Sequence, residues 1–113
     1  MNFNDYQEYA VGTAVYPSVG SNLVYPALGC AGEAGEYADK VKKHWRNTDN
    51  MSASNLTPEQ KKEFAKELGD LLWYIAASAK ELGFTLDVIA SLNVNKIMDR
   101  RARGVVKSEG DNR

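Results

Sequence analysis

The most constraining feature of the sequence is an uncharged stretch in its second half. Residues 71–79 read LLWYIAASA and lie inside a segment with helical periodicity. One apolar stripe runs along this segment and is made of Phe64, Leu68, Leu71, Leu72, Ile75, Ala79 and Leu82. Between residues 71 and 79, however, no face of the helix carries a charge, and a helix that is apolar all round is covered all round. In a chain with so few elements, this favours burial against a second subunit.

Composition and charge restrict the class of protein. A chain of 113 residues with 43% hydrophobic and 26% charged residues is typical of one globular domain, here residues 1–113. The net charge of −1 gives no reason to expect a nucleic acid or a membrane surface as a partner. The sequence has no secretory signal pattern and no apolar run approaching about 18 residues. Its single cysteine, Cys30, excludes an internal disulfide, so we expect a cytoplasmic protein.

Helical periodicity and capping signals predict an all-α fold. The predicted helices span residues 4–14, about 26–45, 58 to about 82, and 86 to about 103. The expected irregular segments are a loop at 15–24, a loop at 46–57 and a mobile tail at 105–113. Asn4 and Gln7 have the spacing of a capping box, and Thr57 followed by Pro58 is a typical helix start. Thr85 is the expected N-cap of the last helix.

Two pairs of acidic residues carry the chemistry. Glu33 and Glu36 lie in CAGEAGEYADK, and Glu67 and Asp70 lie in KELGD. Because each pair is spaced i, i+3, each lies on one helix face, and four carboxylates converge if the two faces meet. Two like charges about 4 Å apart repel by about 4 kcal/mol at an effective dielectric near 20, so protons or metal ions must compensate them. Hard oxygen ligands without His or Cys favour Mg²⁺, with Mn²⁺ as a substitute.

Small residues surround the first acid pair. Gly32 and Gly35 each cost a helix interior about 1 kcal/mol relative to alanine. We expect them to thin the helix so that a second helix can approach and share a metal ion. An ion pair between Glu36 and Lys40 is compatible with the same helix face.

A polar stripe on the last predicted helix supplies candidate substrate contacts. Asn93, Lys96, Arg100 and Arg103 fall within about 80° of one another on the helical wheel. An amide and three cations beside an acidic metal site suit a polyphosphate, although Arg100 and Arg103 equally suit a solvated helix end. Tyr74 lies on the same side as Asp70 and is the aromatic residue expected to contact the ligand.

Two other residues near the acids have simpler interpretations. Trp73 is expected to serve packing rather than ligand stacking. Glu63 is expected to be a solvated acid, or an acid that contacts a metal ligand, rather than a ligand itself.

These motifs resemble one known family. The segments LGCAGEAGEYADKVKK, KELGDLLWYIA and NVNKIMDRRARG, between Leu28 and Gly104, are similar to those of the MazG-like nucleotide pyrophosphohydrolases of the all-α NTP pyrophosphatase superfamily. The resemblance implies a four-helix bundle completed by dimerisation, as a dimer or a dimer of dimers. It implies Mg²⁺-dependent hydrolysis of nucleoside triphosphates to monophosphate and pyrophosphate, in housecleaning of the nucleotide pool. It also implies metal ligation by Glu33, Glu36, Glu67 and Asp70.

Two functions of other classes fit the same residues. A non-catalytic helical dimerisation module would carry the acids as surface decoration. A nucleotide-binding sensor would keep the metal site without turnover. The sequence leaves open the base and sugar of the substrate, the number of metal ions, and which carboxylate activates water.

Overall fold

The structure is a computed structural model of the chain, and it describes residues 1–104. Over this range it contains helices and no strand, which confirms the all-α prediction. The elements are α1 (Phe3–Gly12), α2 (Val24–Thr48), the short 3₁₀ helix η1 (Ala53–Asn55), α3 (Pro58–Glu81) and α4 (Leu86–Arg103). The tail predicted to be mobile, 105–113, lies outside the described residues.

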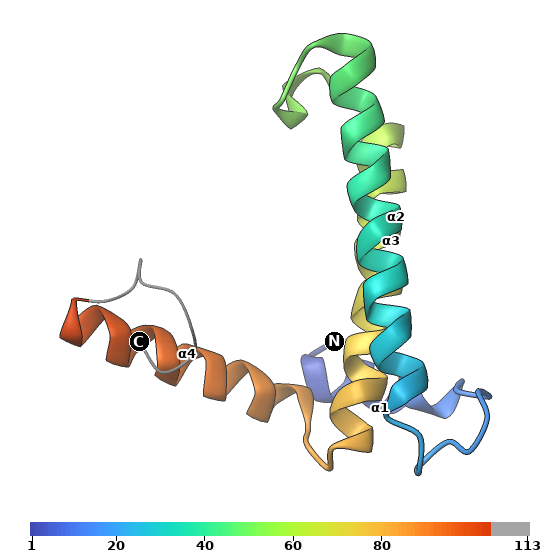
Figure 1. Cartoon of the computed structure of the whole chain (residues 1–113), viewed down its shortest axis with the longest axis vertical. Coiled ribbons are helices and arrows are strands. Elements are labelled where there is room, and N and C mark those ends of the chain that lie inside the picture. Colours follow the sequence, from blue (N-terminus) through green and yellow to red (C-terminus); the bar gives the residue numbers. More distant parts are fainter. Residues whose placement is uncertain (105–113) are drawn as a thin grey trace.

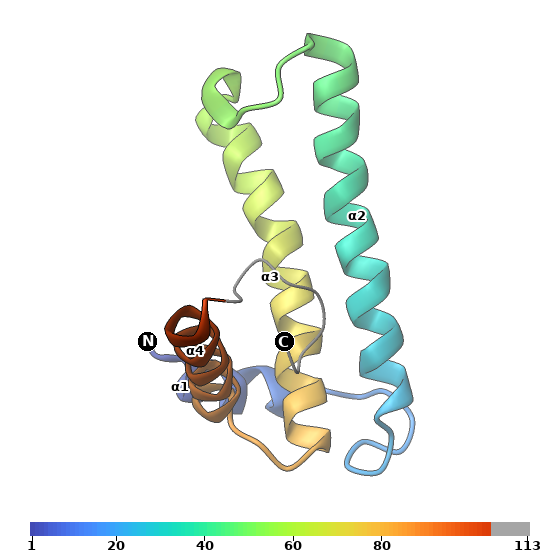
Figure 2. The same ribbon diagram turned by 60° about the vertical axis from the view of Figure 1, so that its left-hand side comes forward.

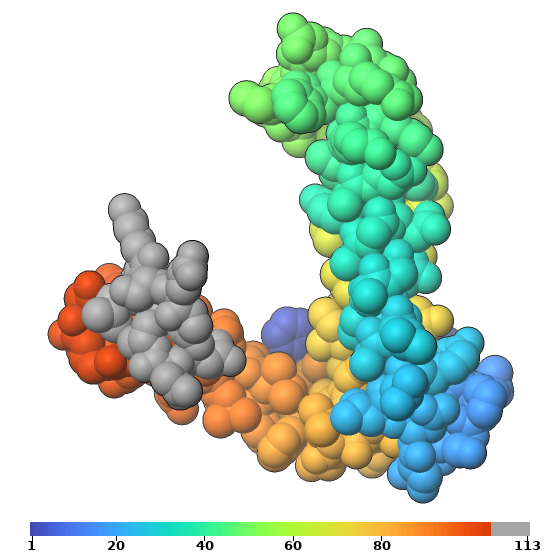
Figure 3. All heavy atoms as spheres, viewed as in Figure 1, coloured from blue at the N-terminus to red at the C-terminus, as the bar shows by residue number. Residues whose placement is uncertain are grey.

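The helices form a long hairpin with two arms at its base. α2 and α3 run antiparallel side by side, and α1 lies across the end of the hairpin at which α2 begins and α3 ends (Figures 1 and 2). α4 leaves that end and projects away from the hairpin, so the molecule has an open angle between α3 and α4 (Figure 3). The radius of gyration is 16.8 Å, whereas a compact chain of this length has about 13 Å. One chain is therefore an open assembly of helices rather than a closed bundle.

Local signals explain most helix ends. Thr57 and Gln60 form a complete capping box at the start of α3, and the Thr85 hydroxyl accepts a hydrogen bond from the Val88 N–H at the start of α4. Both predicted starts are confirmed. α2 ends later than predicted. It continues through Thr48, so the first three residues of the predicted 46–57 loop are helical. It stops at Asp49, whose φ of 55° is left-handed.

The predicted cap of α1 is wrong. Asn2, not Asn4, caps this helix by accepting a hydrogen bond of 2.8 Å from the Asp5 N–H. The Asn4 side chain instead accepts a hydrogen bond from the Asp87 N–H of α4, at 3.2 Å. Gln7 is buried and likewise bonds elsewhere in the chain. Tertiary partners therefore replace the local capping box at both positions.

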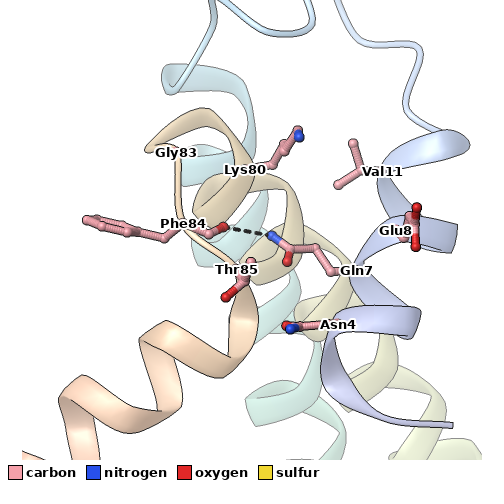
Figure 4. A pocket seen from close by; sticks show the side chains of 8 residues that line it. All are labelled: Asn4, Gln7, Glu8, Val11, Lys80, Gly83, Phe84 and Thr85. Atoms are coloured by element: carbon pink, nitrogen blue, oxygen red, sulfur yellow. Dashed lines mark hydrogen bonds between the residues drawn. The ribbon is translucent and has the colours of Figure 1, made fainter.

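Gln7 holds α1 against the turn between α3 and α4. Its amide nitrogen donates to the carbonyls of Phe84, at 3.0 Å, and Ala76, at 3.3 Å, and its amide oxygen accepts from the Leu86 N–H at 3.0 Å. A hollow of about 410 Å³ lies beside these bonds, between α1 and the turn (Figure 4). None of the predicted site residues lines it.

The core of the described chain is small and rich in alanine. Its buried cluster consists of Ala10, Ala76, Ala79 and Leu86, with Tyr6, Trp73 and Ile89 packed against it. The apolar stripe of α3 is only partly covered by its own chain. Leu68 and Ile75 remain 46% and 37% exposed. Among residues 1–104, no helix has both the length and the apolar character needed to span a membrane.

Candidate metal and nucleotide site

The α2–α3 hairpin brings three acidic side chains together. Glu33 from α2 and Glu67 and Asp70 from α3 each offer a carboxylate oxygen, and these oxygens lie within 4.8 Å of one another. The i, i+3 spacing places Glu67 and Asp70 on one face of α3, and the antiparallel packing places Glu33 opposite them. Glu36, the fourth predicted ligand, is exposed and lies outside this group.

Mutual repulsion is evident in the electrostatics of this cluster. The pKa of Glu33 is raised above its usual value by desolvation first, and then by the negative charges of Asp70, Glu67 and Glu36. The charge of Glu36 therefore still acts on the cluster from outside it. An added cation would relieve this repulsion.

The donor set fits a hard divalent cation. Ligands on opposite sides of an octahedral Mg²⁺ at about 2.1 Å are about 4.2 Å apart. Carboxylate oxygens that already lie within 4.8 Å of one another need only small side-chain movements to reach this geometry. The group contains no His or Cys, which disfavours Zn²⁺ and copper.

One lysine crosses the hairpin to the cluster. Lys40 of α2 has its Nζ atom 2.8 Å from Oε1 of Glu67, so its ion pair is with α3 rather than with Glu36 of its own helix. The hydrogen bond to Glu67 is the main cause that raises the pKa of Lys40, and the negative charges of Glu67, Glu63 and Glu36 add to it. Glu63 itself pairs with Lys66 at 3.0 Å and is exposed, as expected for a solvated acid.

An open hollow of about 510 Å³ adjoins the carboxylates. Its lining consists of Tyr6, Glu33, Gly69, Asp70, Trp73 and Tyr74. The pKa of Tyr74 is raised by desolvation and then by neighbouring groups that include Tyr25, Glu33 and Asp70. Trp73 donates from its indole nitrogen to the Thr13 hydroxyl at 3.0 Å and packs against the core, as its packing role predicts. The same indole also forms part of the hollow.

Tyr6 is the residue of this hollow that the sequence did not indicate. It lies on α1, and the charge of Asp70 contributes to its raised pKa, after desolvation. Its place in the hollow depends on the docking of α1, which long-range hydrogen bonds determine. The sequence carries no local signal for this contact.

Gly29 leaves room for the Tyr74 ring. A Cβ atom at Gly29 would collide with the ring, so only glycine permits this approach of α2 and α3. At Gly32 and Gly35, by contrast, a Cβ would have no neighbouring atom within 4 Å. The prediction that Gly32 and Gly35 set the distance between the helices is therefore wrong within one chain, and Gly29 has this role.

Further aromatic residues continue from Tyr74 to the loop before α2. Tyr25 lies 6.5 Å from Tyr74 and stacks on Tyr16 at 5.1 Å between ring centroids. The Tyr16 hydroxyl donates to the Glu81 carboxylate at 2.6 Å, which raises the pKa of Tyr16, already increased by burial, to about 12. Glu81 also accepts hydrogen bonds from the backbone of Gly20 and Asn22, so its carboxylate anchors the loop to α3.

The predicted polar stripe lies on a separate arm. Asn93 is exposed and borders an apolar hollow in the angle between α3 and α4, Lys96 is half-buried, and Arg100 is buried. Arg103 pairs with Asp99 of its own helix at 2.8 Å. α4 runs away from the hairpin (Figure 1), and no described residue of α4 lines the carboxylate hollow. One chain thus unites three acids with Tyr74, but does not bring the stripe to them.

Comparison with known proteins identifies the family of this chain. The family model of the MazG nucleotide pyrophosphohydrolase domain matches residues 26–105, a range that holds α3, α4 and all of α2 except its first two residues. The Gene 37 protein of Mycobacterium phage L5 is 40% identical over 118 aligned positions that cover all of both chains, and its name states no activity. No solved structure matches the chain significantly. The chain belongs to the MazG nucleotide pyrophosphohydrolase domain family.

Proposed function

We propose that this protein hydrolyses a nucleoside or deoxynucleoside triphosphate to the monophosphate and pyrophosphate, with Mg²⁺ or Mn²⁺ as cofactor. The observation that carries the proposal is the convergence of Glu33, Glu67 and Asp70 beside an aromatic hollow, in a chain of this family. Turnover of the nucleotide pool is the corresponding cellular role.

Each group of residues has a separate task in this reaction. Glu33, Glu67 and Asp70 would hold the metal, and Glu36 adds negative charge beside them. Mg²⁺ held by these residues would neutralise phosphate oxygens and would make water a better nucleophile toward the α-phosphorus. Tyr74 and its aromatic neighbours in the hollow offer flat surfaces to the base. Such chemistry depends mainly on positioning and charge, so no nucleophilic side chain is required, and one of the glutamates orients the water.

A second copy of the chain completes the proposed enzyme. The exposed apolar side chains of Leu68 and Ile75 and the apolar hollow between α3 and α4 leave a face that a symmetry mate can cover. In such a dimer, α4 of the second copy can carry its Asn93 and Lys96 toward the hairpin of the first. Light scattering should show a dimer or tetramer. A stable monomer at micromolar concentration would contradict this assembly.

The function is tested by removal of one ligand. Asp70→Asn should abolish Mg²⁺-dependent pyrophosphate release from a panel of ribo- and deoxyribonucleoside triphosphates while the helical circular dichroism signal survives. Glu59→Gln, a change of the same kind in the first turn of α3, is the matched control and should retain activity. More than about a tenth of wild-type activity in Asp70→Asn, a barrier change below about 1.4 kcal/mol, would rule out the metal assignment.

Thermal stabilisation by metal and nucleotide, measured beside pyrophosphate release, separates the two rival functions. A dimerisation module would show no thermal stabilisation by Mg²⁺ or Mn²⁺. A sensor would be stabilised by metal and nucleotide but would release no pyrophosphate from any member of the panel.

A further inference from the structure

Lys40 differs from the lysines beside it on α2. Lys42 and Lys43 both pair with Asp39 of their own helix, at 3.1 and 2.8 Å. Lys40 instead reaches across to α3 and contacts Glu67, a side chain that is only 15% exposed, while its own side chain remains 39% exposed. Lys40 is therefore an ammonium group that touches the carboxylate cluster and also faces solvent.

The ion pair has a clear role in the metal-free protein. Three carboxylates within 4.8 Å repel one another, and the Lys40 charge offsets part of this repulsion at Glu67. A divalent cation at the cluster would have the same sign as the Lys40 ammonium. Binding of the metal therefore weakens the electrostatic attraction between Lys40 and Glu67.

We propose that Lys40 exchanges partners during substrate binding, from Glu67 in the metal-free protein to a phosphate oxygen of the triphosphate once metal occupies the cluster. This inference rests on the proposed function, because it assigns a further contact to the same site. Two features support it: the long flexible stem of lysine, and a position in which the Lys40 ammonium contacts Glu67 while it also faces solvent. A polyanion that approaches an acidic cluster needs such a cation at the edge of the metal.

A fixed structural role for Lys40 predicts a different result. If Lys40 served only to orient Glu67 as a metal ligand, its removal would disorder that ligand and weaken metal binding. Under partner exchange, removal of the competing cation strengthens metal binding and weakens nucleotide binding. The two effects have opposite signs, which a general loss of structure does not produce.

The test compares Lys40→Met, which keeps an unbranched side chain, with Lys43→Met as the matched control on the same helix. Mn²⁺ affinity of the metal-free protein is measured by titration calorimetry, and binding of a non-hydrolysable triphosphate analogue is measured with saturating Mg²⁺. For Lys40→Met we expect Mn²⁺ affinity to rise about three- to tenfold and analogue affinity to fall roughly 10- to 100-fold. Lys43→Met should change either value by less than about twofold.

Each outcome bears on the inference. Unchanged or weaker Mn²⁺ binding in Lys40→Met overturns the exchange, and so does unchanged analogue binding. Neither measurement needs turnover. A wild-type protein that binds Mn²⁺ and analogue but releases no pyrophosphate would refute the proposed hydrolysis and leave the role of Lys40 decided by the two affinities. A wild-type protein that binds no Mn²⁺ overturns both.

Discussion

Three glycines of α2 allow a direct measurement of which helix faces are in contact. Gly29, Gly32 and Gly35 all lie within the helix, so replacement by alanine should stabilise each position by about 1 kcal/mol through helix propensity alone. The three sites differ in what the new methyl group meets. At Gly29 it collides with the Tyr74 ring, whereas at Gly32 and Gly35 it meets no atom within 4 Å.

The magnitudes follow from this difference. Insertion of a methyl group into a filled space costs about 1–3 kcal/mol, because the ring or the helix must move. Gly29→Ala should therefore change the free energy of unfolding by about 0 to −2 kcal/mol, and Gly32→Ala and Gly35→Ala should each raise it by about 1 kcal/mol. A gap of about 1–3 kcal/mol between Gly29→Ala and Gly32→Ala is the expected result.

Urea denaturation followed by circular dichroism measures this gap. The three variants and the wild type are compared in the absence of metal and at one protein concentration, because self-association would make stability depend on concentration. Equal midpoints for Gly29→Ala and Gly32→Ala would refute the contact between Gly29 and Tyr74. A loss of stability in Gly32→Ala or Gly35→Ala would refute the inference that these positions are open. It would indicate that another subunit packs against this face of α2.

Two further predictions concern stability. Gln7→Ala removes three hydrogen bonds and leaves the Phe84 carbonyl and the Leu86 N–H without this partner, so the free energy of unfolding should fall by about 2–4 kcal/mol in urea denaturation. Glu81 has a lowered pKa, chiefly from the Tyr16 hydroxyl, so its contribution is present above pH 4.5 and is lost as the pH falls below that value, and Glu81→Gln should flatten the acid side of the stability profile.

The acid cluster should show the opposite pH dependence. The pKa of Glu33 is raised, so the folded, metal-free protein binds this proton more tightly than the unfolded chain does. Its effect is to lower stability as the pH rises above 4.5. Glu33→Gln should remove this decline in thermal unfolding measured over a pH series, and an unchanged profile would contradict the clustering of the acids.

The sequence predicted the helices and the acid cluster, in which three of the four expected acids lie, because both depend on local rules. Capping at Thr57 and Thr85 involves residues within three positions, and the i, i+3 spacing of Glu67 and Asp70 fixes their common face. When two such helices pack as a hairpin, their acidic faces can lie opposite one another, and little further sequence signal is needed to predict this.

Contacts that depend on tertiary register were not predictable in the same way. From the sequence, Lys40 could form an ion pair either within its own helix or across the hairpin. The register of α2 against α3 determines that its partner is Glu67. Gly29, rather than Gly32 or Gly35, meets Tyr74 for the same reason. Tyr6 lines the hollow because α1 docks on backbone groups that are distant in the sequence. No periodic pattern in the sequence predicts such a contact.

The hydrogen bonds of Gln7 also have a consequence for the order of folding. They join residues 69, 77 and 79 positions apart, and closure of a loop of that length costs about 4 kcal/mol of chain entropy. The α2–α3 hairpin closes over a short connection from Asp49 to Thr57 and needs no such closure. Local contacts form faster than distant ones. We therefore expect the acids to assemble early with the hairpin, and Tyr6 to join the hollow only when α1 docks at the end of folding.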